Sequence, residues 1–216
     1  MNKTKVAFAL NILIFLLEVF AVSWMASGFS RGIYSVPGLA MFRYFTIDSN
    51  ILMGFSALIS LIGEYKKIKG KKEELSFFEK VFKLAAVTGV TLTMLVTMFF
   101  LAPTSPFGYF ALFTYSNFFL HLLNPLLSII VFVFFEKSNN TSIKNTFYGI
   151  IPMAIYSIYY VGAAITHSHN GIIDVGYDWY GFFPFGLKSA IIVLPLIYFC
   201  TYLISLFLWK LNKEKR

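Results

Sequence analysis

The sequence has few charged side chains and almost no cysteine. Asp, Glu, Lys and Arg make up 13% of its 216 residues, whereas a soluble domain carries roughly 25%. A water-facing surface needs such side chains, so their scarcity excludes an ordinary soluble globular domain. Cys200 is the one cysteine, which excludes a disulfide framework and any cysteine-based metal motif.

Apolar residues take the place of the missing charge. The chain is 58% hydrophobic and 19% aromatic, and its mean hydropathy is +0.72. A helix needs about 20 apolar residues to cross a bilayer core. Runs of this length cover residues 6–27, 38–63, 80–102, 108–135, 144–166 and 186–209. They are continuous rather than alternating, which favours helices over membrane strands. We therefore expect an all-α polytopic membrane protein, a bundle of six transmembrane helices that forms one domain over residues 1–216.

The basic residues indicate the orientation of this bundle. Fifteen of the 18 Lys and Arg residues lie at the N-terminus, between the second and third runs, between the fourth and fifth, or at the C-terminus. The positive-inside rule then predicts that both termini are cytoplasmic. Since these residues serve as topology signals, the net charge of +8 does not indicate a nucleic-acid partner. The first run is too long for the core of a signal peptide, so we expect a retained span.

The composition also suggests a setting. Its many Lys, Ile and Asn residues are typical of an AT-rich bacterial genome, and the predicted location is the cell membrane. The bilayer and a lipid or fatty-acyl substrate are the expected partners, while the oligomeric state is not indicated. His167 and His169 have neither helical i, i+4 spacing nor a thiolate beside them, so we expect no metal site and no cofactor.

A few ionisable groups fall inside the predicted spans, where they are costly and usually mark a function or a structural pair. Glu18, Asp48 and His121 lie well within spans, and Arg43 lies in the outer part of the second. We expect Glu18, Arg43 and Asp48 to contribute to a buried charged pocket. The alternative is that Glu18 and Arg43 form a structural ion pair.

Two helix faces carry the other buried polar groups. In the second span, Arg43, Thr46 and Asn50 share one face. In the fourth span, polar residues recur at steps of 4, 3 and 4: Asn117, His121, Asn124 and Ser128. Such a stripe should face protein or water rather than lipid. Measured from the outer ends of their predicted spans, Thr46 and His121 lie at depths of roughly 14 and 20 Å. These similar depths predict one cavity in the outer half of the bundle.

These residue types suit nucleophilic chemistry. A threonine hydroxyl attacks an ester once a base takes its proton, and a neutral histidine is the usual base. Thr46 and His121 are the catalytic candidates. Asn117 or Asn124 would orient the imidazole, and Asn50 would donate to the oxyanion. The structural alternatives are a threonine bonded back to its own helix, a packed histidine and asparagines that join helices.

At these residues the sequence resembles the androgen-induced and androgen-dependent membrane hydrolases. That family consists of multi-span threonine hydrolases that cleave fatty acid esters of hydroxy fatty acids. Its nucleophile follows a basic-aromatic stretch near the start of the second span, and the segment Arg43–Thr46 is similar. Its histidine precedes a proline in the fourth span, as His121 precedes Pro125, and the aromatic segment 177–185 resembles one after its fifth span. The resemblance implies a Thr46 nucleophile, a His121 base and a lipid-ester substrate.

Two functions outside this class stay open. The alternative is a non-enzymatic carrier or channel for a small solute or lipid, in which Glu18, Arg43, Asp48 and His121 bind or relay charge. Its support is the number of buried ionisable groups, and the absence of visible repeats speaks against it. A membrane subunit with a structural role is the third possibility.

Overall fold

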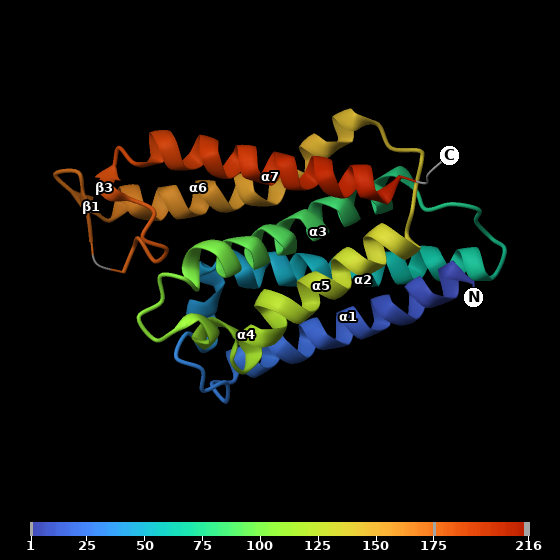
Figure 1. Ribbon diagram of the computed structural model, residues 1–216, viewed down its shortest axis with the longest axis horizontal. Helices are drawn as coiled ribbons and strands as arrows, with labels where there is room; N and C mark the ends of the chain where they lie inside the picture. Colours follow the sequence, from blue (N-terminus) through green and yellow to red (C-terminus); the bar gives the residue numbers. More distant parts are fainter. Residues whose placement is uncertain (1, 175, 214–216) are drawn as a thin grey trace.

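The structure, a computed structural model, describes residues 2–174 and 176–213. These residues contain six helical segments long and apolar enough to cross a membrane, which confirms the expected helical multi-pass architecture: Lys3–Ala26, Phe45–Ile68, Phe77–Leu101, Ser116–Phe135, Ile143–Thr166 and Gly186–Asn212. In the described residues, strand structure is limited to β1 (Ser168–His169), β2 (Ile172–Ile173) and β3 (Pro184–Leu187), of which β1 and β2 pair antiparallel. These strands lie in the connection before the last helix (Figure 1).

The spans are built from α-helices and shorter 3₁₀ and π turns. The helices are α1 (Lys3–Ala26), α2 (Phe45–Ile68), α3 (Phe77–Val96), α4 (Ser116–Phe118), α5 (Asn124–Ile130), α6 (Ile151–Thr166) and α7 (Ala190–Asn212). The 3₁₀ segments are η1 (Gly38–Arg43), η3 (Tyr109–Phe113) and η6 (Ile143–Ile150). The π turns are η2 (Thr97–Leu101), η4 (Phe119–Leu123) and η5 (Val131–Phe135).

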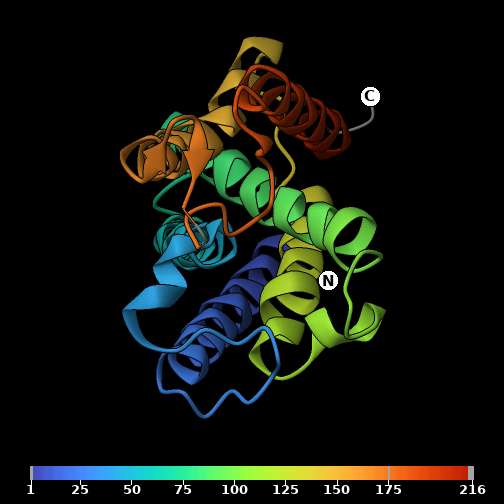
Figure 2. The same cartoon turned by 90° about the vertical axis from the view of Figure 1, so that its left-hand side faces the viewer.

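Helix α3 occupies the middle of the bundle. Figure 2 shows α1, α2 and α5 on one side of it and α6 and α7 on the other. The most apolar stretch of the span that contains α3 is 67% buried. The corresponding stretch of the span that contains α7 is only 17% buried. Val87 and Val90 of α3 pack in a fully buried cluster with Ile14, Met53 and Val131 of the surrounding spans. The core therefore forms around α3, and α7 has most of its surface available to lipid.

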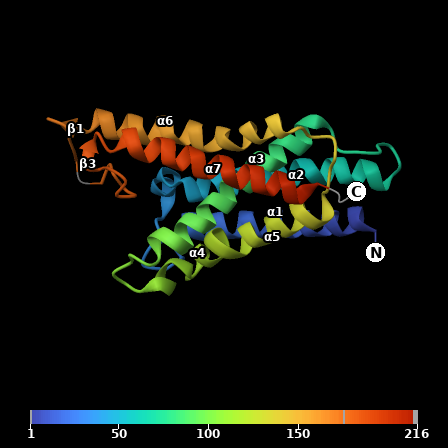
Figure 3. The same cartoon turned by 45° about the horizontal axis from the view of Figure 1, so that its top comes forward.

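The two ends of the bundle differ in what they carry. Both termini lie at one end, called here the terminal end, and the connection with β1 and β3 lies at the other, the loop end (Figures 1 and 3). At the terminal end, α3 begins with a capping box in which Ser76 and Glu79 satisfy each other's backbone amides. The cytoplasmic position of the terminal end is still a prediction.

Two spans begin later than the apolar runs suggest. Residues 38–43 form the 3₁₀ segment η1, Tyr44 is extended, and α2 begins only at Phe45. In the same way, Tyr115 has a φ of 54° and interrupts the chain before Ser116. A non-glycine residue with positive φ is strained, so no helix continues through it. Thr46 consequently lies in the first turn of α2, nearer the loop end than the depth estimate placed it.

The fourth span is interrupted by a proline. Pro125 has no N–H for the carbonyl of His121, and its ring would crowd that carbonyl in an α-helix. The chain responds with the π turn η4, in which the amide of Asn124 donates to the carbonyl of Phe119. Single π turns of this kind occur often at functional sites. His121 lies inside this one.

Candidate active site at the loop end

A cavity of about 450 Å³ lies at the loop end of the bundle. The ends of several spans and the connections between them line it. Thr46 of α2 and His121 of η4 both line it, as the sequence predicted for a common cavity. The other lining residues are Met25, Ile33, Tyr34, Val36, Met41, Tyr44, Ile47, Leu101, Thr104, Ser105, Pro106, Leu112, Asn117, Trp179 and Tyr180.

The His121 imidazole is held by the backbone of η3. Its Nδ1 lies 2.7 Å from the carbonyl oxygen of Leu112, and the Phe113 ring meets it edge-on at 6.4 Å. A carbonyl only accepts, so Nδ1 carries the proton and donates it to Leu112. In the neutral imidazole, Nε2 is then the nitrogen with a free lone pair. The hydrogen bond fixes the tautomer that a general base requires.

The Thr46 hydroxyl is not bonded to a carbonyl of its own helix among the described residues. Threonine in a membrane helix usually donates to the carbonyl four residues earlier. For Thr46 that residue is Phe42, which precedes α2 and belongs to η1. The side chain is half-buried and lies next to the Tyr180 hydroxyl. Its place in the first turn leaves this hydroxyl available to the cavity.

Aromatic side chains fix the start of α2. The Tyr180 hydroxyl accepts a hydrogen bond from the amide of Phe45 at 2.9 Å. The Tyr156 hydroxyl donates to the carbonyl of Arg43 at 2.6 Å and accepts from Trp179 Nε1 at 2.9 Å. Burial raises the pKa of Tyr180 above its ordinary value, so the phenol keeps its proton at neutral pH. Tyr180 can therefore donate to a group bound beside Thr46.

Asp178 orders the loop that carries Tyr180. Its two carboxylate oxygens accept hydrogen bonds from the amides of Phe182 and Phe183, both at 2.9 Å. The Tyr160 hydroxyl donates to the same carboxylate. A carboxylate that accepts hydrogen bonds from backbone amides a few residues later in the chain closes a tight turn. This turn brings Trp179 and Tyr180 over the N-terminus of α2.

The three asparagines expected at the site have different roles. Asn50 is fully buried, and its Nδ2 donates to the carbonyls of Thr46 (2.7 Å) and Leu120 (3.1 Å). It thus joins α2 to the span that carries His121, and neither Nδ2 hydrogen is free for an oxyanion. Asn124 is buried and does not line the cavity. The Leu112 carbonyl takes the orienting role that the sequence suggested for Asn117 or Asn124.

Asn117 is the asparagine that faces the cavity. It is 2% exposed, and its Nδ2 has no hydrogen-bond partner among the described residues. A buried donor left unpaired is costly, so an acceptor brought within its reach would stabilise this group. The sequence placed Asn117 on the same helix face as His121, and both residues line the cavity.

The charged residues expected in the pocket do not gather there. Glu18 is 2% exposed and packs against Gly54 of α2 and beside Asn124, away from the cavity lining. The Arg43 side chain is exposed because η1 turns it outward, and Asp48 is half-buried and forms no ion pair with the described residues. The alternative, a structural Glu18–Arg43 ion pair, is not formed either, and neutral groups dominate this cavity.

A second, narrower cavity of about 40 Å³ meets the first at Thr46. Thr46, Leu101 and Tyr180 belong to both. Beyond them, its walls come from α2, α3, η2, α6, α7 and the loop before α7, and they are almost entirely apolar. Its further lining residues are Phe45, Leu92, Thr93, Val96, Thr97, Met153, Tyr156, Tyr160, Phe182, Phe183, Val193, Leu194 and Ile197.

Sequence reasoning missed two parts of this site. The Leu112 carbonyl carries no residue-type signal, since every residue has one. Tyr180 lies in the aromatic segment 177–185 that the sequence marked as notable, but its contact with α2 spans 135 positions. Only the preceding aspartate, which favours a turn, pointed to order in that loop.

Two further observations concern metal binding and similarity to known proteins. In residues 2–174 and 176–213, no group of three or more His, Cys, Asp or Glu side chains could hold a metal ion. In comparisons with known proteins, no family model, curated protein or solved structure matches the chain.

Proposed function

We propose that this protein hydrolyses lipid esters within the membrane, with Thr46 as nucleophile and His121 as general base. The observation that carries the proposal is their arrangement. A threonine hydroxyl next to the Tyr180 hydroxyl and a histidine with a fixed tautomer line one cavity from two different spans. The proposed substrate class is a fatty-acyl ester, as in the hydrolases that the sequence resembles.

The first half of the reaction acylates Thr46. His121 Nε2 takes the hydroxyl proton as Thr46 Oγ1 attacks the ester carbonyl carbon, and the carbonyl oxygen becomes an oxyanion. When this intermediate collapses, the bond to the leaving alcohol breaks and the imidazolium gives its proton to the alkoxide. The products are an acyl ester on Thr46 and a free alcohol. The Leu112 carbonyl stabilises the transient imidazolium, as the third member of a triad does.

The second half returns the enzyme to its starting state. Water in the cavity gives a proton to His121 and attacks the acyl carbon. The Thr46–acyl bond then breaks, Thr46 Oγ1 recovers its proton from His121, and a fatty acid leaves. Donors for both oxyanions are the free Nδ2 of Asn117 and the Tyr180 hydroxyl. Such preorganised donors act most strongly where water is excluded.

The two cavities suit the two sides of a lipid ester. The narrow apolar cavity is proposed to take the start of the acyl chain, since its walls offer few polar groups. The larger cavity contains hydroxyls of Tyr34, Thr104 and Ser105 and would take the more polar leaving group. Since Thr46 lies where they meet, an ester that extends into both would present its carbonyl to the hydroxyl.

The test is hydrolysis of a fatty acid ester of a hydroxy fatty acid by the purified full-length protein. Thr46→Ala should lower turnover by at least about 10³-fold and abolish labelling by a fluorophosphonate probe. The matched control is Thr104→Ala, because Thr104 lines the same cavity but donates to the carbonyls of Phe100 and Leu101. That variant should keep most of its activity and its labelling. Equal losses in both variants, or labelling that survives Thr46→Ala, would contradict the proposal.

A carrier function has one observation in its favour. The Glu18 carboxylate is buried beside Asn124 and has no cationic partner among the described residues. Buried carboxylates of this kind mark ion or proton pathways in membrane proteins. Flux in proteoliposomes that is lost in Glu18→Gln and retained in Thr46→Ala would favour a carrier over the hydrolase.

A further inference from the structure

The terminal end of the bundle contains a buried polar network that the Thr46 site does not use. Its members come from four spans: Asn11 of α1, Glu64 of α2, Lys83 of α3 and Glu136 at the end of the fourth span. Lys83 Nζ lies 3.2 Å from Glu136 Oε1 and donates to Asn11 Oδ1 at 2.6 Å. The side chains of Lys83 and Glu136 are only 2% and 3% exposed, and Glu64 is 2% exposed. One set of interior side chains thus joins four spans.

The two carboxyl groups of this network contact each other. Asn11 Nδ2 lies 2.7 Å from Glu136 Oε1 and 3.2 Å from both oxygens of Glu64, so one amide nitrogen holds them side by side. The Glu64 and Glu136 side chains also share a hydrogen bond. A carboxylate offers only acceptors, and a hydrogen bond between two carboxyl groups therefore requires a proton on one of them. With that proton, the pair carries one negative charge, which the Lys83 ammonium balances.

The partners of each carboxyl group indicate where this proton lies. Glu136 Oε1 lies against the Lys83 ammonium and accepts from Asn11, and a cation beside a carboxyl favours its ionised form. Glu64 is bonded to the neutral amide of Asn11 and to Glu136. The proton therefore belongs to Glu64, which donates it to the Glu136 carboxylate. Glu136 Oε2 has no other donor among the described residues, so this proton supplies a donor that the carboxylate otherwise lacks.

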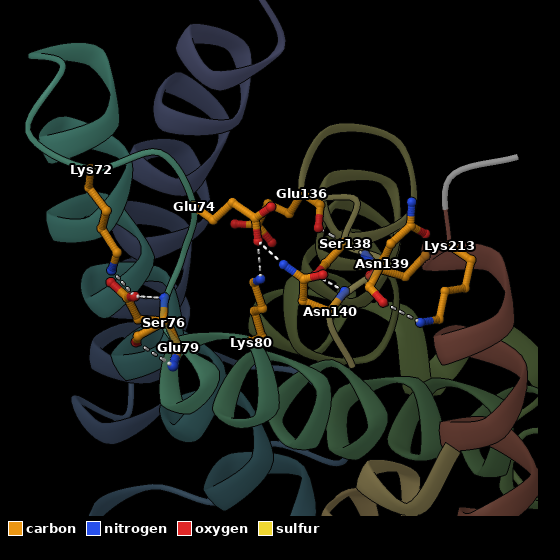
Figure 4. A network of polar contacts seen from close by, with 11 residues as sticks. Lys72, Glu74, Ser76, Glu79, Lys80, Glu136, Ser138, Asn139, Asn140 and Lys213 are labelled. Atoms are coloured by element: carbon orange, nitrogen blue, oxygen red, sulfur yellow. Dashed lines mark hydrogen bonds and ion pairs between the residues drawn. The ribbon is translucent and has the colours of Figure 1, made fainter. Parts of the chain in front are cut away.

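A cavity of about 210 Å³ includes Glu64 and Glu136 in its wall. The other charged residues of the wall are Lys67, Glu74, Lys80 and Lys137. Figure 4 shows Glu136 together with Glu74 and Lys80, which are paired at 2.8 Å. From α1 and α7, the groups in contact with Glu136 are the neutral amides of Asn11 and Asn212. A polar space of this size can hold water, with which the pair can exchange its proton.

We propose that Glu64 and Glu136 form a proton-dependent latch, which closes the terminal end while they share a proton and loosens it when the proton leaves. With the proton bound, each charge of the network has a partner. Without it, two carboxylates face one ammonium in the interior, where an uncompensated charge is costly. α2 and the fourth span are then driven apart, and water from the cavity hydrates the carboxylates.

The sign of the pH dependence follows from where the proton is bound. In the unfolded chain, both carboxyl groups are ionised at neutral pH. Folding therefore takes up one proton, and the folded state loses stability as the pH rises through the range in which the latch releases it. The packing of four spans consequently depends on the pH at the terminal side of the membrane.

The first experiment measures denaturant unfolding of the purified full-length protein in detergent micelles, from neutral to alkaline pH. Glu64→Gln is the decisive variant, because its amide donates to Glu136 as the protonated carboxyl does but has no proton to lose. The folding equilibrium constant of the wild type, relative to this variant, should fall by up to about tenfold per pH unit, the effect of one proton. The matched control is Glu73→Gln, which should follow the wild type, since Glu73 is exposed and lies outside the cavity wall. Parallel pH dependences of the wild type and Glu64→Gln would overturn the proposal.

Infrared spectroscopy detects the shared proton directly and does not require a stable Glu64 variant. The spectra are recorded on Glu18→Gln, because Glu18 is another buried carboxyl group. A carbonyl band of a protonated carboxyl group should be present at neutral pH and should shift in heavy water. The same band should disappear over the alkaline range in which stability falls. If no carboxyl band disappears over that range, the latch does not exist.

Discussion

The two ends of this bundle satisfy their buried polar groups in opposite ways. At the loop end, neutral groups surround the cavity: a threonine hydroxyl, an imidazole bonded to a carbonyl, an asparagine amide and a phenol. At the terminal end, a lysine and two glutamates lie buried in one hydrogen-bonded network. Neutral groups can be left unpaired at moderate cost, whereas an unpaired buried charge is far more expensive. We expect substitutions at the loop end to alter chemistry, and those at the terminal end to alter stability.

The largest effect should come from removing the base. His121→Gln keeps an amide that can still donate to Leu112 but cannot accept and return a proton. We expect ester turnover to fall by about 10³–10⁴-fold, with little change in unfolding temperature. Turnover and thermal unfolding measured on the same preparation check both parts. If His121→Gln lost its activity because the protein unfolds, the expectation that loop-end substitutions alter chemistry rather than stability would be wrong.

Removing the buried lysine should have the next largest effect. Lys83→Met leaves Glu64 and Glu136 without their cation, and breaking a buried pair in this way costs about 3–5 kcal/mol. Denaturant unfolding in detergent micelles measures the loss. The double variant Lys83→Met, Glu136→Leu should recover part of it, since it removes both partners. A double variant less stable than Lys83→Met would mean that Glu136 stabilises the fold without the lysine.

A smaller effect is expected from the phenol that fixes the start of α2. Tyr180→Phe leaves the Phe45 amide without its acceptor and removes a proposed oxyanion donor. Turnover should fall by about 10–100-fold, and the free energy of unfolding by about 1–2 kcal/mol. Tyr159→Phe is the control, because Tyr159 lies in the same aromatic cluster but outside the cavity lining. A similar loss of turnover in both variants would assign the effect to packing rather than to the hydroxyl.

The smallest effect concerns the acid range. Lys80, hydrogen-bonded to Glu74, holds the pKa of that carboxyl below its ordinary value of 4.5. A depressed pKa contributes stability that is complete above the unfolded-state value and is lost as the pH falls through the folded-state value. Glu74→Gln should therefore lower the unfolding temperature slightly at neutral pH and have no effect well below pH 4.5. A difference that persists at low pH would contradict this origin.

The sequence predicted the spans better than their ends. Apolar runs fix how many helices cross the membrane, because the bilayer sets their length. Where each helix starts depends on single backbone conformations. Tyr115 adopts a positive φ that its residue type does not favour, and Gly38 to Arg43 form a 3₁₀ segment inside an apolar run. Neither feature has a signature in hydropathy.

The candidate site was predictable in its side chains and not in its backbone contacts. Helical spacing placed Thr46 and His121 on inward faces, and both line the cavity. The carbonyl that orients His121 belongs to Leu112, a position with no polar side chain. The network at the terminal end was missed for a different reason. Lys83 lies close to the lysines that we interpret as topology signals, so nothing in the sequence set it apart from its exposed neighbours.

The π turn at His121 contains one residue more than an α-helical turn. Five residues, Phe119–Leu123, complete a turn that an α-helix would complete with about four. Deleting Leu122 should therefore let an ordinary α-turn form with little net rotation of the helix on either side. Only the backbone around His121 would change its course. A single extra residue thus widens the helix at the candidate base without altering how the rest of the span packs.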